Sequence, residues 1–225
     1  TYGGCRGFVT LDGSATLRNT LFDNNRFNSK FNNTVNGIVT VQGSATVENC
    51  TFVNNRASTV NGGVLAVNTT GSPVLRNLVF DGNLIYDSET VSDIRDHQNL
   101  AEPWRRVSHS CSSQLTGGTG NFNTTPKLGV EGFPYMPGEG SVCIDHGESA
   151  AWMDGAKDLE GNDRVIGDGP EPGCYEIDPS KVPFSCSISL EGATLGLLPH
   201  KAKFTGTAVI MPQCMDDFTD IIFGF

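Results

Sequence analysis

The chain has 225 residues, a net charge of −10 and a pI near 4.7, with 27 glycines and 8% aromatic residues. This length allows one large or two small domains, and the composition is typical of turn-rich all-β repeats. The charge argues against nucleic acid and anionic membranes as partners but permits calcium or neutral glycans. No apolar run is long enough to span a bilayer, so we expect no membrane insertion by this chain.

A repeat of about 30 residues fills the first 83 positions. Two close copies cover 9–26 and 39–56, with Gly-Ser-Ala-Thr unchanged at 13–16 and 43–46, and a looser third copy covers 63–83. Each copy contains short runs with aliphatic residues at period two and glycine-containing turns between them. One copy is too small to bury its own apolar face, so neighbouring copies must stack.

Stacked copies predict an all-β fold, a single-stranded right-handed parallel β-helix in which each copy is one coil. Equivalent residues then lie about 4.8 Å apart along the axis. Two interior rows are expected to stack: Phe22, Phe52 and Phe80 as an aromatic row, and Leu17, Val47 and Leu75 as an aliphatic one. Because residues 3–6 resemble the end of an earlier coil, we expect further coils to precede this sequence.

Asparagines recur at fixed places in every copy. They form two rows, Asn19, Asn49 and Asn77, and Asn25, Asn55 and Asn83. Asparagine tolerates a left-handed backbone and bonds to the main chain, so it suits the corners between strands. Stacked amides would also bond along the axis. The recurrence favours structural corner ladders over the alternative, a polar ligand-binding face.

The strict period fades after Asn83. Residues 87–106 are polar and charged and predict a long loop or an irregular coil, and 107–112 alternate like a strand. This stretch contains the one basic, aromatic patch of the chain. It is formed by His97, Trp104, Arg105, Arg106 and His109. We take Trp104, Arg105, Arg106 and His109 as candidates for stacking a sugar ring, with a solvated loop as the alternative.

The second half of the repeat region resembles a known family. The matching segments are 107–112, 120–128, 140–147, 158–164 and 171–176. They are similar to the closing region of bacterial right-handed parallel β-helix repeat proteins, the secreted pectate-lyase-like solenoids with a "choice-of-anchor Q" ending. Val142 replaces the usual proline of the first ending motif, and Glu171-Pro172 replaces Asp-Ile in the last. The resemblance implies the fold and a secreted or cell-surface location, without fixing an activity.

Carboxylates are concentrated between residues 139 and 178. Our interpretation is that Asp145, Asp158, Arg164 and Glu176 bind turns and one another where the chain closes the solenoid, since an arginine held by a carboxylate pins irregular loops. A calcium site or a catalytic carboxylate pair are the alternatives. The segment 154–159 lacks the ligand spacing of an EF-hand loop. No cofactor is predicted, calcium staying open, and metal ligands cannot be named.

The seven cysteines have no CxxC spacing, which argues against a zinc site. Cys50 lies beside the Asn49 corner and is expected to be a small buried filler. Disulfides among Cys111, Cys143, Cys174 and Cys186 would suit an exported protein, but the sequence does not fix their pairing.

The domain organisation predicted is a β-helix over 1–178, with its C-terminal closure from about 120, followed by a second segment over 179–225. The runs 184–188 and 202–207 alternate and are similar to the opening strands of a PKD-type immunoglobulin-like domain. Residues 221–225 are similar to the start of that domain's next strand, where the chain stops. We therefore expect a truncated, partial β-sandwich.

The function predicted is a non-catalytic, exported surface scaffold for adhesion or glycan contact. The alternative is a polysaccharide lyase or glycoside hydrolase of the pectate-lyase-like superfamily, with its active site largely outside this sequence. The motifs of polygalacturonase-like enzymes are absent from residues 1–178, and the coils offer arginines with few nearby acids. A polysaccharide or cell-surface glycan is the partner expected.

Overall fold

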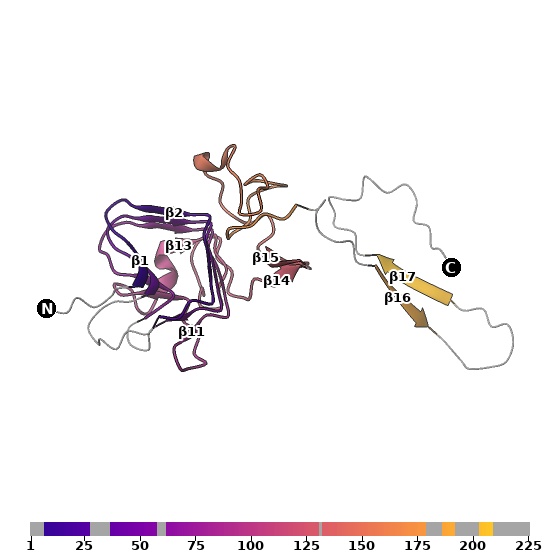
Figure 1. Ribbon diagram of the computed structural model, residues 1–225, viewed down its shortest axis with the longest axis horizontal. Coiled ribbons are helices and arrows are strands. Elements are labelled where there is room, and N and C mark those ends of the chain that lie inside the picture. Colours follow the sequence, from indigo (N-terminus) through magenta and orange to yellow (C-terminus); the bar gives the residue numbers. More distant parts are fainter. Residues whose placement is uncertain are drawn as a thin grey trace. The chain divides into compact units, whose positions relative to one another are not determined.

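The computed structural model describes residues 7–27, 37–57, 62–130, 132–178, 186–191 and 203–208. The chain divides into two compact units, Thr1–Ile177 and Asp178–Phe225. The described residues are all-β, with no α-helix and two short 3-10 helices, η1 (Pro103–Arg106) and η2 (Ala151–Met153) (Figure 1).

The first unit contains a parallel β-solenoid of about three turns, as the repeat predicts (Figure 1). Its three main sheets run along the stack, two with four strands and one with three, and neighbouring strands in each sheet come from successive coils. The first sheet contains β1 (Gly7–Leu11), β4 (Gly37–Val41), β8 (Leu65–Val67) and β12 (Ile94–Asp96). The second contains β2 (Thr16–Arg18), β5 (Thr46–Glu48), β9 (Val74–Arg76) and β13 (Val107–Ser108). The third contains β3 (Leu21–Asp23), β6 (Thr51–Val53) and β10 (Val79–Asp81), and a short sheet pairs β7 (Arg56–Ala57) with β11 (Leu84–Ile85).

The two interior rows are confirmed. Phe22, Phe52 and Phe80 stack with ring centroids 4.9 and 5.0 Å apart and interplanar angles of 5° and 7°. In the aliphatic row, Leu17, Val47 and Leu75 pair in register. Both rows belong to the main buried core, in which Phe52, Phe80, Val47 and Leu75 are at most 2% exposed.

The amide ladder is also confirmed. Asn25 Nδ2 donates to Asn55 Oδ1 at 3.0 Å, and Asn55 Nδ2 donates to Asn83 Oδ1 at 2.9 Å. Asn83 Nδ2 then donates to Asp93 Oδ1 at 2.9 Å, so the ladder ends on a buried carboxylate. The left-handed backbone at this corner belongs to the preceding position, which is Asn24, Asn54 and Gly82 in successive coils.

Steric contact between adjacent coils explains why glycine recurs in the repeated Gly-Ser-Ala-Thr turn. Gly43 has φ +70°, and a Cβ there would lie 2.7 Å from the backbone nitrogen of Gly13 in the coil below. Only glycine allows the turns of adjacent coils to approach this closely.

The structure differs from the sequence-based expectation at residues 87–106. The segment is not only a loop, because β12 within it continues the first sheet and pairs Ile94 with Leu65. Two buried acids, Asp93 just before β12 and Asp96 at its end, interrupt the apolar-polar pattern that would identify a strand. Within the run 107–112, only Val107–Ser108 form β13, and Cys111 then bridges Val79 and Phe122 in the parallel direction.

The closure segment, residues 120–177, begins with a hairpin of β14 (Leu128–Val130) and β15 (Phe133–Pro137) and continues through turns and η2. It also lies along the side of earlier coils. Asn19, Asn49 and Asn77 donate side-chain amides to the backbone oxygens of Lys157, Glu171 and Glu148. The first asparagine row therefore holds the closure segment in addition to turning the chain.

The second unit contains an antiparallel pair, β16 (Cys186–Glu191) and β17 (Lys203–Ala208). This confirms strands within both alternating runs of the sequence. The third predicted run, residues 221–225, lies outside the described residues. Among the residues described, no helix has the length and apolarity needed to cross a membrane.

Candidate functional site

In the structure, each of the predicted sugar-stacking residues has its own set of contact partners. Trp104, in η1, packs partly buried against the main core. Arg106 donates to the carbonyls of Thr69 and Gly71 at 2.9 and 3.2 Å and pairs with Asp96 at 3.2 Å. Arg105 pairs with Glu102 and is the most exposed member of the group. These contacts fix η1 to the third coil, and ligand binding by this group stays a prediction.

His109 contacts other residues than those that hold η1. Its backbone has φ +46°, and its Nδ1 is 3.7 Å from a carboxylate oxygen of Glu148. A Cβ on Gly120 would overlap its ring. His109 therefore packs against the closure segment.

Arg164 is the centre of the closure segment and is completely buried. Its guanidinium donates to the carbonyls of Glu171 and Gly173 at 2.7 and 2.9 Å and pairs with Glu176 at 2.6 Å. Burial raises the pKa of both Glu171 and Glu176, and Glu171 raises the pKa of Glu176 further. Two neighbouring carboxyls beside one arginine favour a shared proton, which balances the buried charge.

The other predicted closure residues bind turns. Asp158 accepts backbone hydrogen bonds from Glu160, Asn162 and Glu176 at 2.8–2.9 Å. Asp145 has φ +57° and accepts from the nitrogen of Asp168 at 3.1 Å. A carboxylate with several N–H donors suits a structural role in an irregular segment.

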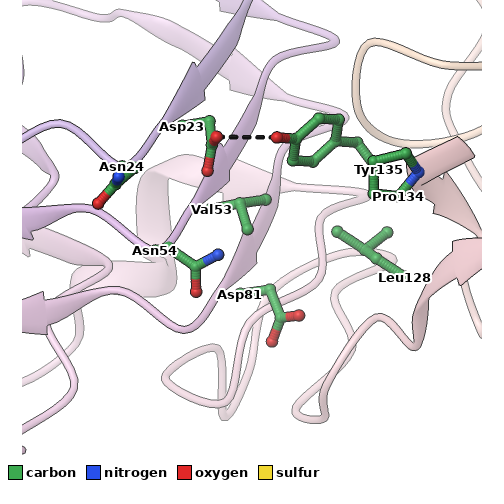
Figure 2. Close-up of a pocket in the computed structure, with 8 residues that line it drawn as sticks. All are labelled: Asp23, Asn24, Val53, Asn54, Asp81, Leu128, Pro134 and Tyr135. Atoms are coloured by element: carbon green, nitrogen blue, oxygen red, sulfur yellow. Dashed lines mark hydrogen bonds between the residues drawn. The ribbon is translucent and has the colours of Figure 1, made fainter.

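A pocket of about 520 Å³ lies where the third sheet meets the hairpin β14–β15 (Figure 2). Asp23, Val53 and Asp81 come from one register position in successive coils and form its floor. Asn24 and Asn54, both exposed, line one side. On the opposite side, Figure 2 shows the hairpin residues Leu128, Pro134 and Tyr135. We call this set of eight residues the acidic groove.

One hydrogen bond joins the two walls of the acidic groove. Tyr135 Oη donates to Asp23 Oδ2 at 2.8 Å (Figure 2), and this bond raises the pKa of Tyr135. The Tyr135 ring also stacks on Tyr175, with centroids 6.2 Å apart and an interplanar angle of 18°. The tyrosine is thus positioned on both its polar and its apolar side.

Asp81 differs from Asp23 in its surroundings. Partial burial raises the pKa of Asp81, while the backbone N–H of Gly82 opposes this effect. Asp23 and Asp81 lie two rungs apart, which corresponds to about 9.6 Å along the axis. The groove therefore offers two carboxyl groups with different surroundings on one sheet face.

The chemistry of the acidic groove suits a polyhydroxyl ligand. Carboxylates and amides accept and donate hydrogen bonds to hydroxyls, and an aromatic ring provides an apolar face with a polar end. The local negative charge disfavours anionic ligands. Within the described ranges, no three His, Cys, Asp or Glu side chains group as metal ligands.

Sequence reasoning missed this groove because its acids do not recur in every coil. Asp23 and Asp81 each follow a phenylalanine of the stacked row, and Val53 occupies the same place in the second coil. The Phe-Asp pairs were the available signal. Tyr135 and the hairpin offered none, because their contact with the first coil spans 112 residues of sequence.

Comparison of the chain with family models, with curated proteins and with solved structures gives no match. The fold itself defines the class, which is a repeat protein built as a parallel β-solenoid.

Proposed function

We propose that this chain is a non-catalytic scaffold of an exported, surface-located protein and that its acidic groove contacts a neutral glycan. The observation that supports this most is the joint placement of Tyr135 and two carboxyl groups on one solvent-open sheet face. The resemblance of the closing region to secreted pectate-lyase-like solenoids adds to it. A β-solenoid suits such a role because stacked coils form an extended, rigid surface.

The ligand class follows from the charge of the groove. Its described lining contains two acids and no base, and the whole chain has a net charge of −10. Polygalacturonate or alginate would be repelled, whereas neutral glucans, mannans or galactans would not. A pyranose could stack one face on Tyr135 and bond its hydroxyls to Asp23, Asn54 and Asp81.

The test is affinity electrophoresis of the chain in gels with neutral or anionic polysaccharides. We expect retardation by at least one neutral glycan and none by the anionic ones. Tyr135→Ala should weaken binding about tenfold, whereas Tyr135→Phe keeps the ring and should weaken it less. Glu89→Gln, an exposed acid outside the groove, is the matched control. Equal retardation of the wild type and Tyr135→Ala would contradict the proposal.

The enzymatic alternative has one observation in its favour. Asp81, with its raised pKa, suits a general acid, and Asp23 lies two rungs away in the position of a base. Inverting glycosidases hold their carboxyl groups about 6.5–9.5 Å apart, which is close to two β-rungs. Release of sugars from a bound neutral glycan, lost in Asp81→Asn, would favour this alternative.

A further inference from the structure

Two cysteines distant in sequence meet in a small buried cluster outside the main core. Cys111 and Cys143 are both fully buried and pack with Val79, with Phe122 and Leu128 around them. Cys111 continues the third sheet at the end of the stack, where it bridges Val79 and Phe122. Cys143 lies in the closure segment, so the cluster joins the last coil to that segment.

The backbone on both sides of the pair is fixed. The Cys111 N–H donates to Leu78 O at 2.8 Å, and Cys111 O accepts from the nitrogen of Phe80 at 2.9 Å. The Cys143 N–H donates to Ser141 Oγ at 3.2 Å, and this hydroxyl in turn donates to Pro126 O. The two side chains interact directly, so neither backbone needs to move far for the sulfur atoms to bond.

The other described thiols have different surroundings. The Cys50 thiol points into the coils and lies 3.3 Å from Glu48 O. Cys174 is held through its backbone nitrogen, which donates to Thr51 Oγ1 at 3.0 Å. Both are fully buried, and Cys174 acts on the Cys50 thiol electrostatically, without the direct side-chain hydrogen bond that joins Cys111 to Cys143.

We propose that Cys111 and Cys143 form a disulfide that ties the closure segment to the last coil. The oxidant is a small-molecule or protein disulfide. Two thiol–disulfide exchanges join the two sulfurs, and the oxidant leaves as two thiols that carry the two protons and two electrons lost by the cysteines. The inference is independent of glycan binding.

The bond should form before the closure segment docks. Contact with Cys143 and burial raise the pKa of the Cys111 thiol well above its usual value. The thiolate is the attacking species, so exchange at this site is slow in the folded, reduced protein. Oxidation during refolding should therefore be faster than oxidation of the folded thiols.

Peptide mapping of the full chain is the first test. The chain is refolded with oxidised and reduced glutathione, its free thiols are alkylated and it is digested with trypsin. Cleavage after Arg106, Lys127 and Lys157 places Cys111 on peptide 107–127 and Cys143 on peptide 128–157. We expect these peptides as one species that reductant separates. Alkylation of both cysteines, or linkage of Cys143 to peptide 31–56 or 165–181, would overturn the proposal.

A stability comparison is the second test. The oxidised wild type should melt about 10 °C above the protein refolded in dithiothreitol, since the bond closes a loop of about 33 residues. Cys143→Ser should lose this difference, and Cys174→Ser, matched in burial and segment, should keep it. Equal loss in both variants, or no difference in the wild type, would refute the disulfide. If Cys143→Ser fails to fold, the peptide map of the wild type still shows whether Cys111 and Cys143 are linked.

Discussion

The coils and the closure segment are stabilised by different kinds of contact, although both have few aromatic and many polar residues. The coils repeat one contact at each rung, as in the Phe22–Phe52–Phe80 stack and the asparagine ladder. The closure segment repeats nothing and converges on Arg164 and its buried carboxyls. A substitution in one coil should therefore cost more stability when the altered residue stacks on two neighbouring coils than when it stacks on one. A substitution at Arg164 should destabilise the whole closure segment.

The two regions meet along a row of coil residues. Glu48, buried in the second coil, pairs with Arg18 below and Arg76 above at 2.6 Å each, and Arg76 also pairs with Glu148 of the closure segment at 2.9 Å. The Arg18 guanidinium lies 4.8 Å from the Trp152 ring centroid. Alternating charge at one repeat position thus joins the rungs and binds the segment beside them.

The largest effect is expected at the middle of the aromatic stack. Phe52→Ala should lower the free energy of unfolding by about 4 kcal/mol, because the fully buried ring leaves a cavity between two others. Phe22→Ala, at a less buried ring with one stacking neighbour in this row, is the control and should cost less. Urea denaturation measures both, and equal losses would show that rungs do not act through their neighbours.

Arg164→Met should cost about 3 kcal/mol, because it leaves Glu171 and Glu176 buried without their cation. Arg105→Met, at an exposed arginine, should be nearly neutral. Hydrogen exchange locates the damage. Loss of protection confined to the closure segment, residues 120–177, supports the comparison, and uniform loss over the coils contradicts it.

The end of the asparagine ladder predicts a pH effect. Burial raises the pKa of Asp93 to about 6, although hydrogen bonds from Ser112 and Asn83 oppose this. The pKa of an unfolded Asp is about 3.9, so the native state binds the proton more tightly. Stability from this group is complete below about pH 4 and is lost as the pH rises through 6, on the order of 3 kcal/mol.

Asp93→Asn isolates that contribution, because the other buried acids stay in place. The wild type should lose more stability than the variant between pH 4 and pH 7 in parallel denaturation series. Identical slopes would mean that Asp93 does not titrate as its burial indicates.

The smallest effect is expected where the regions join. Asn77→Gly keeps the left-handed backbone but removes the amide that bonds to both the nitrogen and the carbonyl of Glu148. We expect a loss of about 1 kcal/mol and faster amide exchange near residue 148. Asn54→Gly, also left-handed but exposed, controls for the glycine itself. A larger loss of stability in Asn54→Gly than in Asn77→Gly would contradict the role of the Asn77 row in holding the closure segment.

The repeat allowed the coils to be predicted because period, apolar row and corner asparagines agree at the same positions. For the closure segment, the sequence predicted that Asp145, Asp158, Arg164 and Glu176 bind turns and one another. It did not predict the completely buried Arg164–Glu176 pair beside Glu171. Strand β12 was missed because buried acids interrupt its apolar pattern. The acidic groove was missed because Tyr135 reaches Asp23 across 112 positions, which no local pattern records.

The most direct test of the central claim is product release by this chain from the neutral glycan that it binds best. We predict that the protein retains the polysaccharide through Tyr135 and that no new reducing ends or unsaturated sugars form over prolonged incubation. Release of oligosaccharides that disappears in Asp81→Asn would contradict a non-catalytic scaffold and make the acidic groove an active site.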